Sequence, residues 1–144
     1  MQLSTIIAAK GAEVMTIQPD APIAQLISTL ASNRIGALVV STDGRTINGI
    51  VSERDVVQAM ARGRDAFDEP VSSIMTAKVF CAPPDAHIED LMQLMTDKRV
   101  RHIPVTDADD HLLGIVSIGD VVKDRMGELE TETQVLHDYI AHGR

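Results

Sequence analysis

Apolar residues recur along this chain with two different spacings. Within residues 23–30, and again within 88–95, apolar side chains stand at positions i, i+3, i+4 and i+7, which places them on one face of an α-helix. Between polar turns lie short runs rich in Val and Ile, and each run predicts a β-strand. These strands are expected at residues 14–17, 37–40, 47–51, 79–81, 102–105 and 112–116.

The predicted elements occur in the same order twice. Residues 14–63 align with residues 79–128 at a constant shift of 65, and such internal similarity indicates a duplicated unit. The longest shared stretch, Gly-Ile-Val-Ser-x-x-Asp-Val-Val, occupies residues 49–57 and 114–122. In each copy this stretch joins an apolar strand to a helix. The sequence therefore predicts an α+β fold, in α/β layers, made of two β-α-β-β-α repeats.

Polar and charged segments suggest the boundaries. We expect residues 1–63 to hold the first repeat with a short N-terminal helix, 64–78 a linker with one helical turn, 79–128 the second repeat, and 129–144 a helical tail that packs or faces a partner. The helices after the shared motif should end near Gly63 and Gly127. A unit of this size buries too little surface to be stable alone, so the repeats should share a core. Pro104 cannot donate to a β ladder, so its strand should be exposed on that edge or bent there.

Composition and charge exclude several classes of function. A net charge of −8 and a pI near 4.9 do not suit a protein that grips nucleic-acid phosphates, and two Phe, one Tyr and no Trp leave almost no platform for base stacking. No apolar run reaches the length of about 18 residues that suggests a membrane span. Cys81 is the only cysteine, which fits a reducing compartment. We therefore predict a cytoplasmic protein that contacts neither nucleic acid nor membrane.

Candidate chemistry is concentrated at the two shared strand-to-helix corners. Ser52 and Asp55 in the first copy, and Ser117 and Asp120 in the second, have the spacing of a capping box, in which the Ser hydroxyl and the acid satisfy the start of the helix. Capping alone would explain both pairs. The alternative is that each carboxylate also accepts two hydrogen bonds from the neighbouring hydroxyls of a ribose, beside a helix N-terminus suited to phosphate.

The densest basic group of this acidic chain lies where the predicted strand of residues 102–105 begins. It consists of Arg99, Arg101 and His102. Arg side chains bind phosphate through two parallel hydrogen bonds, although an Arg near a turn is more often simply solvated. The first copy has Gly-Ala where the second has Arg-His, and keeps only Arg34. The two copies should therefore differ in their binding of phosphate.

The duplicated motif, together with Arg-Val-Arg-His-Ile-Pro-Val at residues 99–105, resembles a tandem pair of cystathionine-β-synthase (CBS) domains, also called a Bateman module. The resemblance covers residues 1 to about 128, with no enzyme or transporter domain attached, as in a stand-alone CBS pair. It implies two repeats about a pseudo-twofold axis, a homodimer, and clefts between the repeats. Those clefts would bind adenosine-containing ligands such as AMP, ADP, ATP, NAD(H) or S-adenosylmethionine.

The resemblance also implies roles for individual residues. The ribose would be held by Asp55, Asp120, Ser52 and Ser117. The phosphates would be held by Arg101, His102, Arg99, Arg34, Arg54 and Lys10, although a lone Lys in a loop is surface by default. The adenine slots would be formed by Met15, Thr16, Ile17, Leu38 and Val39, and by Phe80, Cys81, Ala82, Ile103 and Pro104, which could equally be plain core residues. We expect the Asp55 corner, facing Arg101 and His102, to be the better phosphate-bearing site.

The resemblance favours a regulatory, non-catalytic module that binds an adenine nucleotide and reports energy or redox status to an unknown protein partner. The alternative is a structural or adaptor protein with empty clefts, acting through its dimer surface and its acidic C-terminal helix. An enzyme is disfavoured, because the sequence holds no Gly-x-Gly-x-x-Gly and no P-loop and arranges no nucleophile with a base. His137 and His142 make only a weak metal pair, so no metal is predicted. The preferred ligand and the dimer orientation stay open.

Overall fold

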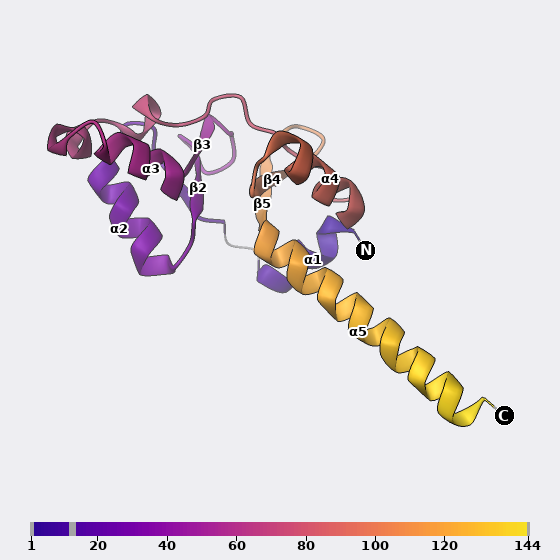
Figure 1. Cartoon of the computed structure of the whole chain (residues 1–144). Coiled ribbons are helices and arrows are strands. Elements are labelled where there is room, and N and C mark those ends of the chain that lie inside the picture. The colour runs from indigo at the N-terminus through magenta and orange to yellow at the C-terminus, as the bar shows by residue number, and fades with distance from the viewer. Residues whose placement is uncertain (1, 12–13, 144) are drawn as a thin grey trace.

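Each repeat forms a small sheet beside two helices. The computed structural model describes residues 2–11 and 14–143 (Figure 1). The chain begins with helix α1 (Leu3–Lys10), followed by β1 (Thr16–Ile17), α2 (Ile23–Asn33), β2 (Ala37–Val40), β3 (Gly49–Ser52) and α3 (Glu53–Met60). Two 3-10 helices, η1 (Arg64–Asp68) and η2 (Val71–Ser73), lead to α4 (Ile88–Lys98), β4 (His102–Thr106), β5 (Leu112–Ser117) and α5 (Ile118–His142). The mixed fold of two repeats predicted from the sequence is confirmed.

The sheet of the first repeat has three strands in the order β1-β2-β3. β1 runs parallel to β2, with Thr16 opposite Val39, and β2 pairs antiparallel with β3, with Ala37 opposite Ser52. Every residue of β2 is buried, which explains why its sequence is a continuous apolar run rather than an alternating one. The predicted hairpin is confirmed, although β3 begins at Gly49, two residues later than expected.

In the described parts of the chain, the sheet of the second repeat has two strands, β4 and β5. The prediction of a strand at residues 79–81 is wrong. The next residue, Ala82, makes a single bridge to Val105, and no strand forms before it. The N–H of Ala82 donates to the carbonyl of Pro104 (3.0 Å), so Pro104 faces this outer side of β4. Val39 holds the corresponding place in the first repeat and has an N–H for the ladder, whereas Pro104 has none. The ladder therefore stops after one bridge.

The two amphipathic helices have the predicted form. α2 and α4 each bury three apolar residues, at positions i, i+3 and i+7. Both helices then end at an arginine in the left-handed conformation, Arg34 with φ 53° and Arg99 with φ 54°. Residues other than Gly and Asn seldom occupy this conformation. The same turn thus carries the chain into β2 and into β4, and it places one arginine at the same point of each repeat.

The core of each repeat is completed by a segment from outside it. Leu3 of α1, which is 0% exposed, lies in the core of the second repeat, although α1 precedes the first. Val71 of η2 completes the core of the first repeat in the same way. The N–H of Leu3 donates to the carbonyl of Ala86 (3.0 Å), and the N–H of Val71 to that of Ala21 (2.8 Å). The expectation that the N-terminal helix belongs with the first repeat is therefore corrected, because its apolar residues are buried in the second.

The last helix is longer than predicted. A helix end was expected near Gly127, but α5 continues without a break from Ile118 to His142. A glycine inside a helix costs only about 1 kcal/mol relative to Ala, and the helix-favouring residues on both sides outweigh this cost. Figure 1 shows the C-terminal half of α5 projecting away from both repeats. In the linker, η2 is the expected helical turn and η1 is additional.

Candidate functional site

The two Ser-x-x-Asp corners have the same local geometry. The N–H of Ser52 donates to Oδ2 of Asp55 (2.8 Å), and the N–H of Ser117 donates to Oδ2 of Asp120 (2.9 Å). Both corners form a capping box at the start of α3 and of α5. Within residues 2–11 and 14–143, the bonds that the two carboxylates accept all go to Oδ2. Capping therefore leaves Oδ1 of each aspartate to accept from a ligand.

Beside Asp120 lies a cavity of about 370 Å³, here named the Asp120 cavity. Both repeats and the end of α1 contribute to it. Its apolar wall includes Met15, Ile35, Leu38 and Ile115, and its polar groups are Lys10, Arg34, His102, Ser117 and Asp120. An apolar slot with a few converging polar groups is the usual form of a small-molecule site.

Lys10 reaches into this cavity and binds the aspartate itself. Its Nζ lies 2.7 Å from Oδ2 of Asp120 and 2.8 Å from the carbonyl oxygen of Ile115. Burial alone would raise the pKa of Asp120, but the hydrogen bonds from Lys10 and from the N–H of Ser117 outweigh it and lower that pKa. The sequence placed Lys10 among the phosphate contacts and gave no sign of this pair, because the two residues lie on elements at opposite ends of the chain.

Beside Asp55 lies a second cavity, of about 290 Å³, here named the Asp55 cavity. Its side chains include those of Ser52, Gln58, Val79 and Phe80. Its charged side chains are one carboxylate, Asp55, and four cations, Arg54, Lys78, Arg99 and Arg101. Such an excess of positive charge suits an anionic ligand. The sequence analysis found three of these cations but missed Lys78, which lies in the linker.

His102 lines both cavities. Its ring lies against the backbone of Gly36, where an added Cβ would stand 3.4 Å from its Cε1. Burial lowers the pKa of His102, and the neighbouring charges of Arg101 and Lys10 lower it further. Gly36 is the residue that corresponds to Arg101 in the repeat, and the imidazole of the second copy packs against it on the first copy's side.

The residues predicted for the adenine slots are divided between cavity and core. Met15 and Leu38 line the Asp120 cavity, and Phe80 lines the Asp55 cavity. The others line neither cavity, and several of them are core residues, with exposures of 4% for Ile17, 1% for Val39, 6% for Ala82 and 0% for Ile103. The remaining three are Thr16, Cys81 and Pro104. Val14 and Val79, a matched pair in the repeat, line one cavity each, and that match was a usable signal in the sequence. The ligand role of every residue stays a prediction.

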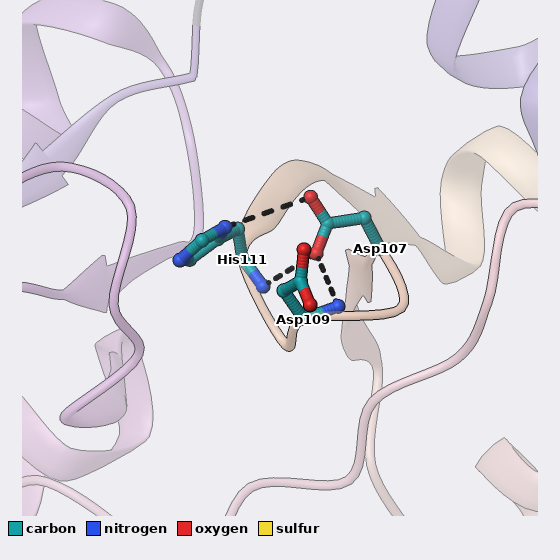
Figure 2. Close-up of side chains that lie close together, drawn as sticks. All are labelled: Asp107, Asp109 and His111. Atoms are coloured by element: carbon teal, nitrogen blue, oxygen red, sulfur yellow. Dashed lines mark hydrogen bonds and ion pairs between the residues drawn. The ribbon is translucent and has the colours of Figure 1, made fainter.

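One further cluster of potential ligand atoms lies in the turn between β4 and β5, at Asp107, Asp109 and His111 (Figure 2). Oδ1 of Asp107 accepts from the N–H of Asp109 and from the N–H of His111, both at 2.9 Å. These backbone bonds lower the pKa of Asp107, that from His111 most strongly. A guanidinium nitrogen of Arg45 stands 3.3 Å from Nδ1 of His111 and would repel a cation. The cluster therefore shapes the turn.

The turn of the first repeat is built in the same way. Oδ1 of Asp43 accepts from the N–H of Arg45 (2.8 Å) and from the N–H of Thr46 (2.7 Å). The carbonyl of Arg45 in turn accepts from the N–H of Leu112 (2.8 Å). The two hairpins thus meet at their turns, which holds the repeats in register around the cavities. Of the helices in the described parts of the chain, none is both long and apolar enough to cross a lipid bilayer.

Comparison with known proteins agrees with this architecture. The sequence profile of the CBS domain matches residues 10–62 and 71–127. The CBS domain-containing protein CBSX3, mitochondrial, of Arabidopsis thaliana is 37% identical over 129 residues, which cover 86% of this chain but only 62% of that protein. The CBS-domain containing protein ATU1752 from Agrobacterium tumefaciens has a crystal structure that is 38% identical and superposes with a TM-score of 0.81, over 87% of this chain and 99% of that one.

Two less similar structures contain adenosine compounds. CBSX2 in complex with AMP is 23% identical, with a TM-score of 0.71 over 80% of this chain and 89% of that one. The CBS domain pair of MJ0100, in complex with 5′-methylthioadenosine and S-adenosyl-L-methionine, is 20% identical, with a TM-score of 0.76 over 85% of this chain and 98% of that one. At these identities the likeness concerns the fold alone. From the two profile matches and the two repeats, we conclude that this chain belongs to the CBS domain family, as a tandem CBS pair.

Proposed function

We propose that this CBS pair is a regulatory module that binds an adenosine-containing ligand between its repeats. The observation that carries the proposal is the pairing of each capping-box aspartate with a cavity. Among the described residues, the hydrogen bonds to both carboxylates reach Oδ2 and leave Oδ1 for a ligand, and basic residues line each cavity. The complexes of CBSX2 with AMP and of MJ0100 with S-adenosyl-L-methionine support this choice of ligand class. Candidate ligands are AMP, ADP, ATP, NAD(H) and S-adenosylmethionine.

The two cavities differ in charge, so we expect them to differ in their affinity for phosphate. In the Asp55 cavity, four cations face one carboxylate, and a polyphosphate would neutralise them. In the Asp120 cavity, Lys10 is already paired with the aspartate (2.7 Å), which leaves Arg34 and His102 for phosphate. This supports the prediction that the Asp55 corner is the better phosphate-bearing site, with ADP or ATP bound there in preference to AMP.

The module acts without catalysis, as a cytoplasmic homodimer whose ligand favours one of two shapes. The shape is read by a protein partner. A ligand can shift such an equilibrium only through a difference in affinity for the two shapes. Because residues of both repeats line each cavity, and α1 lines the Asp120 cavity as well, a ligand would bias how the repeats sit against each other and, at the Asp120 cavity, how α1 sits against them.

Calorimetric titration with AMP, ADP, ATP, NAD and S-adenosylmethionine tests the proposal, with Asp55→Asn and Asp120→Asn as variants. Loss of a charged hydrogen-bond acceptor costs about 1.5–3 kcal/mol, so each variant should weaken its own site by roughly 10- to 150-fold. Asp20→Asn, at an exposed position outside both cavities, is the matched control. If every ligand binds more weakly than about 1 mM, or if neither cavity variant changes affinity, the proposal is wrong.

A second function, that of an adaptor with empty cavities, is favoured by one observation. The C-terminal half of α5 exposes Leu129, Leu136, Tyr139 and Ile140, which a solvated helix would not need. An adaptor would keep its partner in the absence of nucleotide and would lose it when the chain is cut after Gly127. Partner binding that follows nucleotide concentration instead would refute the adaptor.

A further inference from the structure

His102 is shared by the two cavities. Among the described residues, it is the one that lines both the Asp120 cavity and the Asp55 cavity. Its side chain is half-buried, and its Cε1 and Nε2 would lie 3.4 Å and 3.5 Å from a Cβ built on Gly36. A ligand in either cavity would therefore lie beside the same titratable ring.

The place of His102 in the fold explains how one ring reaches both cavities. His102 begins β4 and stands opposite Ser117 of β5, whose N–H donates to Asp120 (2.9 Å). Its neighbour Arg101 lines the Asp55 cavity. The corresponding residue of the first repeat is Ala37, whose side chain cannot carry a charge. The module therefore holds a titratable group at one of these two equivalent positions.

Charged groups from several segments determine whether the ring holds a proton. They are Arg101, Lys10 of α1, Glu53 of α3 and Asp120 of α5, with Arg34 in the wall of the Asp120 cavity. Burial lowers the pKa of His102 most, and the two cations Arg101 and Lys10 lower it further, against the effect of the two carboxylates. An anion in the Asp55 cavity would offset Arg101, and one in the Asp120 cavity would offset Lys10. Either anion would favour the protonated ring.

Two anions that favour the same proton must also favour each other, because coupling between binding events is reciprocal. The first ligand draws a proton from solvent onto the ring, and the second then meets an imidazolium instead of a neutral imidazole. If each anion strengthens proton binding about tenfold, the two anions strengthen each other about threefold at the pH where the singly occupied module is half-protonated.

We propose that His102 couples the two cavities, so that an anionic ligand in one strengthens the binding of an anionic ligand in the other through a proton held on the shared imidazole. This inference rests on the proposed function and adds to it communication between the two sites. It differs from a phosphate contact made by His102 within one cavity, which would change the affinity of that cavity alone.

Calorimetric titration of the full chain with ATP measures the coupling. Asp55→Asn and Asp120→Asn each give the affinity of the cavity that is left intact, and the wild type gives the overall constant for filling both. The coupling is this overall constant divided by the product of the two single-cavity affinities. We expect a coupling of about threefold or more at about pH 6.5, the ordinary pKa of histidine. At about pH 8.5 the ring has lost its proton, and the coupling should fall to about one or below.

Two histidine substitutions supply the variant and its matched control. His102→Gln keeps a side chain that can form hydrogen bonds but cannot take up the proton, so it should abolish the rise in coupling between about pH 8.5 and about pH 6.5. His137→Gln, at an exposed position of α5 outside both cavities, should leave that rise unchanged. A rise that survives His102→Gln, or that both variants reduce equally, would overturn the proposal. Far-ultraviolet circular dichroism checks that both variants are folded.

An NMR titration tests the mechanism with the ring in place. ATP should raise the midpoint of His102 in Asp55→Asn and also in Asp120→Asn, because the ring adjoins the cavity that each variant keeps. A midpoint raised in one variant alone would overturn the shared role. Failure of ATP to bind either cavity would overturn this inference and count against the proposed function as well. ATP that fills both cavities independently, or only one of them, would overturn the inference and leave the proposed function intact.

Discussion

Gly114, the first residue of the repeated motif in its second copy, lies directly beneath α1. A Cβ at this position would stand 2.5 Å from Cδ1 and 3.3 Å from Cγ2 of Ile7. The tip of Ile7 can rotate away, but Cγ2 is fixed to the branched Cβ and cannot clear the space by that rotation. We therefore predict that Gly114→Ala pushes α1 away from β5.

Two opposing contributions determine how Gly114→Ala changes the free energy of unfolding. Overpacking of a fitted contact costs about 1–3 kcal/mol, while Ala in place of Gly within a strand gains about 0.5–1 kcal/mol. Gly114→Ala should therefore lower the free energy of unfolding by about 1 kcal/mol. In an Ile7→Ala background the clash is absent, and the same substitution should raise the free energy of unfolding by about 0.5–1 kcal/mol.

Urea unfolding followed by circular dichroism, on the four proteins of this cycle, measures the coupling between Gly114 and Ile7. The distinguishing result is that Gly114→Ala should lower the free energy of unfolding in the wild-type background and raise it in the Ile7→Ala background. Equal effects of Gly114→Ala in both backgrounds would refute the reasoning, because the lost stability would then come from somewhere other than α1. Gly49, the corresponding residue of the first repeat, serves as a comparison. A Cβ added there would meet the backbone oxygen of Thr76 at 2.9 Å as well as Sδ of Met75 at 2.7 Å. Shortening Met75 should therefore not rescue Gly49→Ala.

Three further outcomes are expected. Leu26→Ala, at a side chain that is 0% exposed, should lower the free energy of unfolding by about 2–5 kcal/mol in urea, and a change under 1 kcal/mol would contradict the assigned core. Because the pKa of Asp120 is lowered in the fold, its stabilising contribution is present above the unfolded value of about 3.9 and is lost as pH falls through the folded pKa. The stability difference between wild type and Asp120→Asn should thus shrink in acid, and a constant difference would be inconsistent with the lowered pKa. An NMR titration of His102 should give a midpoint below the ordinary value of about 6.5, and Lys10→Met should raise that midpoint by removing a neighbouring positive charge; an unmoved midpoint would exclude Lys10 as a cause.

The features that the sequence predicted well depend on local patterns. The helices α2 and α4 bury the positions that their spacing indicated, because a helix with one apolar face has a single way to meet a sheet. The capping boxes at Asp55 and Asp120 formed as their spacing predicted. The failed strand at residues 79–81 was also predictable in principle. Pro104 has no N–H to donate to a neighbouring parallel strand, so the segment before Ala82 has no ladder partner at that position.

The features that the sequence missed depend on contacts between distant segments. No local pattern connects Lys10 with Asp120, and nothing in the spacing of α1 shows which repeat will bury Leu3. Lys78 could be assigned to the Asp55 cavity only once the path of the linker was known. The charge of the cavities is therefore a tertiary property, and it is what makes the two sites unequal.

The placement of α1 on the second repeat affects the order in which the chain can fold as it is synthesised. All the residues in the core cluster of the first repeat lie between Ile17 and Val71, so that core can close as soon as this segment has left the ribosome. The core cluster of the second repeat runs from Leu3 to Val121. At about 5–20 residues per second, Leu3 is made roughly 6–24 s before Val121 and stays exposed to solvent, or to a chaperone, in the meantime. The first helix to be made is thus the last to be buried.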